Sequence, residues 1–451
     1  MPIETRPNVM FILVDDLGWG DVSYHGSPIR TPNIDRLVSR GIELDFHYVN
    51  PVCTPTRASL LSGRYPGRFG RHATVPSNDP VLPDGYWTMA SMFREAGYTT
   101  ALFGKWHLGS DPKYYPGQYG FDHSYGSLAG GVDPYNHHYK RGVHSSTWHR
   151  DGQVYDRLER GHVTDLLTDE AIRWLNAQEG PWFCYMPYTA VHTPIRAPES
   201  WIDRYWFERM DPDPHRDRSL KEYAAYTAHL DHAIGRLIET LKCMDQIHNT
   251  IVVFVSDNGA STASVAEDTN LYPGWHEDMP RRGSNYPLRG TKATVYEGGI
   301  RTPAAVMWQS RWAPRRLAEP LHIVDWMPTF AALLGIAPRT DPRWDGANIL
   351  PLLEGQVGAL PERPLYWNLT HSRFAVRQGG WKLIRNQRDW GVETELIQIA
   401  EDPLEERNVA AQHPEIVARL EQVLAEQHTL DDTARRPDAP QKEGLSGLAR
   451  R

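Results

Sequence analysis

The run VMFILV at residues 9–14 is apolar throughout and ends abruptly at Asp15 and Asp16. A short apolar run without alternation is typical of a strand that is buried on both faces of a sheet. Three further runs have the same character: Thr99–Phe103, Trp182–Tyr185 and Ile251–Val255. Between these runs lie sequences with the helical spacing of apolar residues: Thr31–Arg40, Met89–Ala96, Asp165–Gln178 and Tyr223–Met244. The alternation predicts an α/β fold, with a large mixed, mostly parallel sheet sandwiched by helices.

The composition narrows the class of protein. The chain has 451 residues, of which 40% are hydrophobic and 23% charged, and its net charge is −8. These values exclude collagen, coiled coil and wholesale disorder, and the acidic balance argues against a nucleic-acid partner. No segment approaches the ~18 consecutive apolar residues that cross a bilayer, and the first residues lack the pattern of a secretory signal. We therefore expect a cytoplasmic protein with no membrane contact, and we make no prediction of its oligomeric state.

Polar side chains follow each of the predicted strands directly. The first strand is followed by two aspartates and the strand at 251–255 by Ser256-Asp257-Asn258, whereas the other two lead to lysine and histidine. The carboxyl ends of parallel strands meet at one edge of a sheet, where α/β proteins bind their ligands. The residues expected to converge there are Asp15, Asp16, Lys105, His107, His192, Asp257 and Asn258. Each of these could be an ordinary turn or cap residue by itself, but four separate coincidences are improbable.

The acidic members of this group predict a metal site. Asp15, Asp16, Asp257 and Asn258 offer only oxygen ligands, which suit a hard divalent cation and not zinc. Without a cation the three carboxylates would raise one another's pKa values. We favour Ca²⁺ because its looser coordination accepts a crowded protein cage, with Mg²⁺ as the alternative.

The segment Cys53-Thr-Pro55-Thr-Arg57-Ala-Ser-Leu-Leu-Ser-Gly63 predicts a short helix with proline in its first turn and a glycine stop. Cys53 then lies at the helix N-terminus, where free N–H groups favour negative charge, and Arg57 lies one turn further on. Its position indicates a reactive residue, and a plain thiolate nucleophile is one interpretation. The other two cysteines, Cys184 in a strand and Cys243 in a helix, are interpreted as small buried hydrophobic residues.

The sequence resembles the formylglycine-dependent sulfatases. Cys53-Thr-Pro-Thr-Arg57 matches the family's Cys-x-Pro-x-Arg signature, and the Ser-Leu-Leu-Ser-Gly-Arg continuation follows it. The resemblance extends along most of the chain through the blocks Asp15–Asp21, Gly104–Gly109, His192–Pro194, Ser256–Gly259, Arg289–Lys292, Tyr296–Pro303 and Asp325–Phe330. Within the family, the blocks Asn285–Gly290 and Gly130–His137 look most like the arylsulfatase B (N-acetylgalactosamine-4-sulfatase) branch.

The resemblance implies an activity and a mechanism. A formylglycine-generating enzyme would oxidise Cys53 to formylglycine (3-oxoalanine), whose hydrated gem-diol attacks the sulfate ester and forms a sulfated-enzyme intermediate. The divalent cation would be held by Asp15, Asp16, Asp257 and Asn258 and would also touch the gem-diol at position 53.

The resemblance also implies roles for the charged residues around position 53. Arg57, Lys105 and His107 would surround the aldehyde hydrate, and His192 and Lys292 would grip the sulfate, one of them protonating the leaving oxygen. We assign the activation of the gem-diol to Asp257 and the proton removal that expels sulfate to His107.

The resemblance also implies the alkaline-phosphatase-like fold of sulfatases, with a catalytic α/β domain at residues 1–355. From residue 356 to 432 we predict a C-terminal subdomain with a small antiparallel sheet and a packing helix. Its predicted elements are the strands Leu365–Asn368, Ser372–Val376, Trp381–Arg385 and Glu395–Ile399 and a helix near His413–His428. The remaining residues, 433–451, are poor in apolar side chains and are predicted to form a flexible tail.

Three alternatives to a sulfatase stay open at this point. A phosphonate monoester or phosphodiester hydrolase of the same superfamily would use the same set of residues. A non-catalytic binder of sulfated glycans, or a hydrolase that uses the thiol itself, would require Cys53 to stay unconverted. The expected substrate is a small sulfated molecule, either an aryl sulfate or a sulfated sugar.

Overall fold

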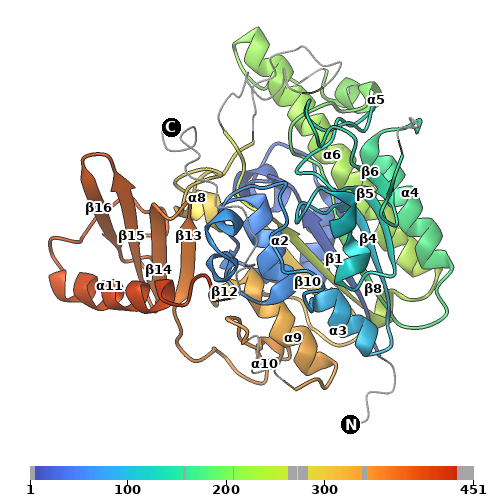
Figure 1. Ribbon diagram of the computed structural model, residues 1–451. Coiled ribbons are helices and arrows are strands. Elements are labelled where there is room, and N and C mark those ends of the chain that lie inside the picture. The colour runs from blue at the N-terminus through green and yellow to red at the C-terminus, as the bar shows by residue number, and fades with distance from the viewer. Residues whose placement is uncertain are drawn as a thin grey trace.

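The computed structural model of the protein describes residues 6–155, 159–206, 208–262, 272, 283–337 and 343–433. A 10-stranded sheet forms its centre, with the strand order β11-β2-β10-β9-β1-β8-β4-β5-β6-β7 (Figure 1). The strands are β1 (Asn8–Val14), β2 (Ile42–Leu44), β4 (Thr99–Lys105), β5 (His123–Ser127), β6 (Trp148–Arg150), β7 (Gln153–Val154), β8 (Trp182–Pro187), β9 (Thr250–Ser256), β10 (Ala304–Trp308) and β11 (Arg315–Leu317).

The middle of this sheet is parallel. Strand β1 pairs in parallel with β8 on one side and β9 on the other, and β4 pairs in parallel with β8 and β5. Antiparallel pairs occur further out, between β10 and its neighbours β9 and β2 and between β5, β6 and β7. The sheet is therefore mixed and mostly parallel at its centre, as predicted, and the carboxyl ends of β1, β4, β8 and β9 meet at one edge.

Alternate residues of β1 pack on opposite faces, which explains its uninterrupted apolar sequence. Val9, Phe11 and Leu13 belong to one hydrophobic cluster, and the residues between them belong to the other. The first face is covered by α2 (Cys53–Ser62), α3 (Met89–Glu95), α9 (Trp326–Leu333) and α10 (Leu350–Leu353). The second face is covered by α1 (Pro32–Arg40), α4 (Val163–Asn176) and α6 (Pro214–Cys243), with α5 (Glu199–Ile202) against α6.

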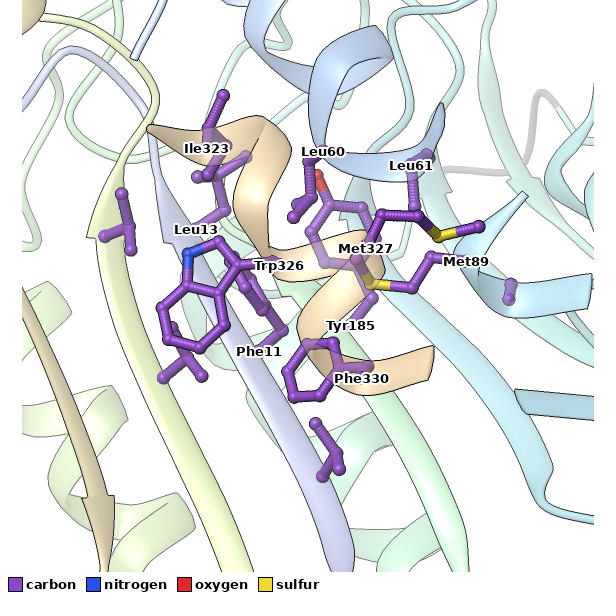
Figure 2. Close-up of a cluster of buried hydrophobic side chains, with 14 of the residues drawn as sticks. Phe11, Leu13, Leu60, Leu61, Met89, Tyr185, Ile323, Trp326, Met327 and Phe330 are labelled. Carbon is purple, nitrogen blue, oxygen red and sulfur yellow. The ribbon is translucent and has the colours of Figure 1, made fainter. Parts of the chain in front are cut away.

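The helix that begins at position 53 is held by the core of the first face. Figure 2 shows Trp326 and Phe330 of α9 next to Phe11 of β1, with Leu60 and Leu61 of α2 on the other side of α9. The rings of Phe11 and Trp326 meet edge to face with centroids 5.7 Å apart. Every residue of α2 is buried, so the position of its first residue is fixed by packing along the whole helix.

A second, 4-stranded antiparallel sheet lies to one side of the main sheet, at the left of Figure 1. It consists of β13 (Leu365–Leu369), β14 (Arg373–Gln378), β15 (Trp381–Arg388) and β16 (Gly391–Ile397), with α11 (Pro414–His428) packed against it. Strands β3 (His47–Tyr48) and β12 (Leu321–His322) form a two-stranded sheet, and α8 (Glu297–Ile300) is a short helix that precedes β10.

Three predictions at the level of single elements are wrong. Helix α6 begins at Pro214, not near Tyr223, so its first turns are polar. They are helical because Asp213 caps the helix, accepting hydrogen bonds from two backbone N–H groups of its first turn. Strand β16 begins at Gly391, because pairing with β15 extends to the hairpin turn. Cys243 is exposed on α6, whereas Cys184 is buried in β8 as predicted. The predicted tail lies outside the described residues from 434 onwards, and no helix within the described ranges has the length and apolarity for a bilayer crossing.

A buried ionic cluster joins the small sheet to the main body. The Lys382 ammonium group on β15 lies 2.8 Å from carboxylate oxygens of both Glu297 and Glu405, and all three side chains are buried. Glu297 also accepts a hydrogen bond from the Tyr48 hydroxyl at 2.8 Å. Burial and the neighbouring Glu297 raise the pKa of Glu405 to about 7, whereas Lys382 and two arginines lower the pKa of Glu297.

Replacing Lys382 by methionine should lower the free energy of unfolding by about 3–5 kcal/mol, because two buried carboxyl groups lose their cation. The loss should be smaller well below pH 7 than well above it. Glu405 is protonated in the folded protein below its raised pKa of about 7, so one fewer charge is left uncompensated there. Denaturant unfolding at several pH values measures both effects, with Lys242→Met near the end of α6, where the lysine side chain is 31% exposed, as the control at about 0–0.5 kcal/mol. A Lys382→Met loss no larger than that of the control would contradict this account.

Candidate active site

The edge where the parallel strands end gathers residues from four distant parts of the chain. The backbone N–H of Asp257 donates to the Val14 carbonyl at 2.9 Å, and that of Asp15 donates to the Ala190 carbonyl at 2.9 Å. The first bond extends the β1–β9 pairing by one residue, and the second ties Asp15 to the chain three residues after the end of β8, so side chains that follow three strands are fixed side by side. The interpretation that strand ends converge on one site is confirmed for this edge.

Carboxylates and cations alternate across the site. The Lys105 ammonium group lies 2.6 Å from Asp15, and the Arg57 guanidinium lies 2.7 Å from Asp257 and 3.6 Å from Asp15. All four of these side chains are fully buried. At the more open end, the Lys292 ammonium group bonds Asp16. Each cation therefore faces a carboxylate, as the burial of so much charge requires.

The carboxylates themselves are crowded. Burial and the neighbouring Asp257 raise the pKa of Asp15 to about 7, although Lys105 and Arg57 oppose the shift. The backbone N–H of Asp16 donates to the Asp257 carboxylate at 3.2 Å, and Asp16 itself adopts a left-handed conformation with φ of 63°. This density of negative charge is the condition predicted for a site that takes a cation.

Two oxygens at this site fit that interpretation. Oδ1 of Asp15 and Oδ1 of Asn258 are buried and have no hydrogen-bond partner in the described parts of the chain. Asn258 directs its Nδ2 to the Asp16 carboxylate at 2.7 Å, which leaves its carbonyl oxygen for another ligand. Carboxylate and amide oxygens are the donor set of a hard cation. The ligand atoms of Asp15, Asp16 and His192 also lie within 4.8 Å of one another.

Cys53 is the first residue of α2. The helix ends at Gly63, which has a left-handed conformation with φ of 69°, as the sequence predicts. The side chain is only 2% exposed. Burial raises the pKa of the Cys53 thiol, while the charges of Lys105 and Lys292 act to lower it. A raised pKa leaves less of the thiol ionised at neutral pH, which speaks against the thiolate interpretation.

His107 is buried and held without charge. Burial and the surrounding cations, Lys105 first among them, lower its pKa well below the usual range. Its Nδ1 is buried and without a hydrogen-bond partner among the described residues. The ring lies against Gly130, where a Cβ would approach Nε2 to 2.3 Å, so only glycine fits there.

His192 lies at the mouth of the site with a side chain that is 12% exposed. Its Nδ1 is 2.6 Å from the Thr193 carbonyl oxygen, which can only accept a hydrogen bond, so Nδ1 carries a proton. Its Nε2 lies 3.9 Å from the Asp16 carboxylate. The imidazole therefore presents Nε2 to the site.

The sequence did not predict the residues that hold the segments around His192 in place. The buried carboxylate of Asp133 accepts hydrogen bonds from the backbone N–H groups of Tyr135 and Asn136 and from the Arg196 guanidinium at 2.9 Å. Arg196 lies four residues after His192, so this ion pair ties the His192 segment to the loop that places Gly130 on His107. The only available signal is the richness of residues 117–150 in glycine, tyrosine and histidine, which marks a shaped loop without naming the pair.

The structure brings every predicted site residue to this edge. They are Asp15, Asp16, Cys53, Arg57, Lys105, His107, His192, Asp257, Asn258 and Lys292. Their contacts are facts of the structure, and their catalytic roles stay predictions.

The chain is similar to proteins of one named family. A family model described as Sulfatase matches residues 7–336. N-acetylgalactosamine-6-sulfatase from Homo sapiens is 32% identical over 397 residues, which cover 83% of this chain and 71% of that protein. Arylsulfatase J from Mus musculus is 31% identical over 474 residues, with coverage of 92% and 75%. The likeness to the arylsulfatase B branch stays a prediction.

Solved structures agree with this relationship. The crystal structure of Ps i-CgsB in complex with k-i-k-neocarrahexaose superposes with a TM-score of 0.83 at 28% identity and covers 99% of this chain and 97% of that one. The phosphonate monoester hydrolase of Agrobacterium radiobacter shares the fold, with a TM-score of 0.65 at 20% identity. Proteins of this family generally use a metal ion and formylglycine, and the chain belongs to the sulfatase family, the sulfuric ester hydrolases.

Proposed function

We propose that the protein hydrolyses sulfate monoesters of small sulfated sugars or aryl alcohols, with formylglycine at position 53 and a Ca²⁺ ion beside it. The observation that carries the proposal is the position of Cys53: it is buried at a helix start, where the charges of Lys105, Lys292, Asp15 and Asp257 all act on it. The sugar class is supported by relatives named for N-acetylgalactosamine-6-sulfate and by the oligosaccharide complex of the similar structure.

The modification fits the chemistry of the position. Burial raises the pKa of the Cys53 thiol, so little of it is present as the reactive thiolate. A neutral thiol would also have no use for the positive charges of the lysines beside it. A hydrated formylglycine would supply an oxygen nucleophile at this place. Conversion requires a formylglycine-generating enzyme, which is a further partner of the proposal.

The cation would be held by Asp15, Asp16, Asp257 and Asn258, two of which have an unpartnered buried oxygen among the described residues. A bound divalent cation supplies Lewis-acid polarisation of the sulfate and lowers the pKa of a neighbouring hydroxyl group. Ca²⁺ is favoured over Mg²⁺ because these oxygen ligands lie close together at the edge of a rigid sheet, and Ca²⁺ tolerates irregular coordination geometry.

The chain's own cations provide the sulfate site. The protein carries a net charge of −8, and Arg57, Lys105 and Lys292 at this edge are matched by Asp15, Asp16 and Asp257. A bound divalent cation would therefore supply the net positive charge that an anionic ester meets here, beside the N–H donors of these three residues. His107 stays neutral because of its lowered pKa and can accept a proton at Nδ1. His192, with its Nδ1 proton fixed on the Thr193 carbonyl, can in its doubly protonated imidazolium form donate the Nε2 proton to the leaving oxygen and become the neutral Nδ1–H tautomer.

Replacing His192 by glutamine should lower kcat/KM by about 10²–10⁴-fold for a sulfated sugar, because an alkoxide leaves poorly without a proton. The loss should be much smaller for 4-nitrophenyl sulfate, whose phenolate leaves unaided. Steady-state kinetics with both substrates check this expectation. Equal losses for the two substrates would show that His192 binds sulfate and does not protonate the leaving group.

The proposed function is tested by a panel of sulfated monosaccharides and disaccharides assayed beside an aryl sulfate and an aryl phosphonate monoester. We expect hydrolysis of sulfate esters with a kcat/KM well above that for the phosphonate. A higher kcat/KM for the phosphonate would make the protein a phosphonate hydrolase of the same fold. Binding of sulfated sugars without turnover would make it a glycan-binding protein.

A further inference from the structure

The loop from Arg289 to Glu297, which carries Lys292, is clamped from outside by the small C-terminal sheet. The Arg289 guanidinium donates to the Glu395 carboxylate at 2.7 Å, and the Tyr296 hydroxyl donates to the other oxygen of the same carboxylate. Glu395 belongs to β16. One carboxylate therefore joins both ends of the segment that contains Lys292.

Other strands of the small sheet add to this clamp. The Arg373 guanidinium on β14 donates to the Ala293 carbonyl at 2.9 Å, one residue after Lys292. Lys382 on β15 holds Glu297 at the end of the loop. In Figure 1, α8, which begins at Glu297, lies at the boundary between the two sheets.

On its inner side the same loop contacts the catalytic segments. The backbone N–H of Lys292 donates to the Ala260 carbonyl at 3.0 Å, three residues after Asp257. The next N–H, of Ala293, donates to the Pro51 carbonyl at 2.9 Å, two residues before Cys53. The loop is thus a physical link between the small sheet and the site, and it carries Lys292.

We infer that Glu395 is a positioning residue for Lys292, so that the small sheet sets the sulfate-binding geometry of a site built on the other sheet. This inference rests on the proposed function, in which Lys292 grips the sulfate. Glu395 is suited to the role because its side chain is only 16% exposed and the Arg289 guanidinium it bonds also lies over the Tyr296 ring at 3.9 Å. Arg289, Tyr296 and Glu395 form one closed unit, and loss of the carboxylate removes the side-chain link between Arg289 and Tyr296, although Arg289 keeps its hydrogen bond to the Glu405 carbonyl at 3.0 Å.

Strand β16 offers a matched control. Glu393 lies two residues before Glu395, on the same side of the strand, and pairs with Arg388 at 3.1 Å. This pair is well exposed and none of its described contacts reaches the loop at 289–297. Glu393→Ala therefore removes the same charge from the same strand without removing a hydrogen bond to the loop at 289–297.

The test compares Glu395→Ala with Glu393→Ala in the full-length protein. We expect Glu395→Ala to lower kcat/KM for an aryl sulfate about tenfold and to weaken binding of inorganic sulfate, because a displaced ammonium group no longer faces the anion. Glu393→Ala should leave both values unchanged. Glu395→Gln keeps an acceptor for Tyr296 and should recover part of the loss.

A double-mutant cycle shows whether Glu395 acts through Lys292. In a Lys292→Ala background, Glu395→Ala should change the dissociation constant for inorganic sulfate by less than about twofold, since the group it positions is absent. Calorimetry measures this constant without requiring turnover. If Glu395→Ala does not fold, Tyr296→Phe removes one contact of the same unit and should shift the constant in the same direction.

The outcomes separate the two claims. Equal sulfate affinity in Glu395→Ala and Glu393→Ala, or the same loss with and without Lys292, would overturn the positioning role while leaving the proposed function in place. A wild-type protein that binds inorganic sulfate but hydrolyses no sulfate ester would overturn the proposed function, and the binding cycle would still decide the role of Glu395.

Discussion

Replacing Cys53 by alanine should lower kcat for sulfate esters by about 10⁴-fold or more, because the atom that becomes the nucleophile is removed. The fold should tolerate the change, since alanine suits the first turn of a helix and the position is held by the packing of all of α2. The measurement is single-turnover and steady-state kinetics with 4-nitrophenyl sulfate. Circular dichroism should show an unchanged fold.

The matched control for this prediction is Cys184→Ala. Cys184 is a buried thiol in β8 whose pKa is raised by burial alone, so its loss should cost stability and leave kcat unchanged. If Cys53→Ala retained wild-type kcat, neither formylglycine nor a thiolate at position 53 could be the nucleophile. If both cysteine variants lost activity equally, the effect would be one of folding.

Replacing Asp257 by asparagine should have the second largest effect, with kcat/KM lower by about 10³-fold and a free energy of unfolding lower by about 3 kcal/mol. The carboxylate has two roles in the structure. It faces the buried Arg57 guanidinium at 2.7 Å, and it stands among the oxygens proposed to hold the cation. Asparagine keeps the shape but removes the charge that both partners need.

Added Ca²⁺ separates these two contributions. Weakened cation affinity should make the activity of Asp257→Asn rise with Ca²⁺ concentration beyond the point at which the wild type saturates. A change that only destabilised the fold would show no such rise. Full activity of Asp257→Asn without added cation would contradict the assigned metal site.

The positions of the site residues along the chain could be predicted because they depend on local signals. An apolar run such as 9–14 identifies a buried strand, and the parallel order then brings Asp15, Asp257 and Lys105 to one edge whatever the details of packing. The helix at Cys53 was equally readable, because proline near its start and glycine at its end are local in sequence. The resemblance to sulfatases supplied the roles, which strand ends alone do not give.

The ion pairs that hold the segments around the site in place could not be predicted, because the two residues of each pair are distant in sequence and chemically ordinary. Asp133 and Arg196 are 63 residues apart, and Arg289 and Glu395 are 106 residues apart. An arginine and a carboxylate in separate segments of the chain carry no signal that they meet, since surface ion pairs of the same types are common. Their pairing follows from the packing of whole elements.

The most direct test of the account is mass spectrometry of the peptide that contains residue 53, taken from protein produced together with a formylglycine-generating enzyme and shown to be active. The account predicts a peptide in which sulfur is replaced by oxygen and two hydrogens are lost, with the fraction converted tracking the specific activity. An active preparation in which this peptide carries only an unmodified cysteine would contradict it.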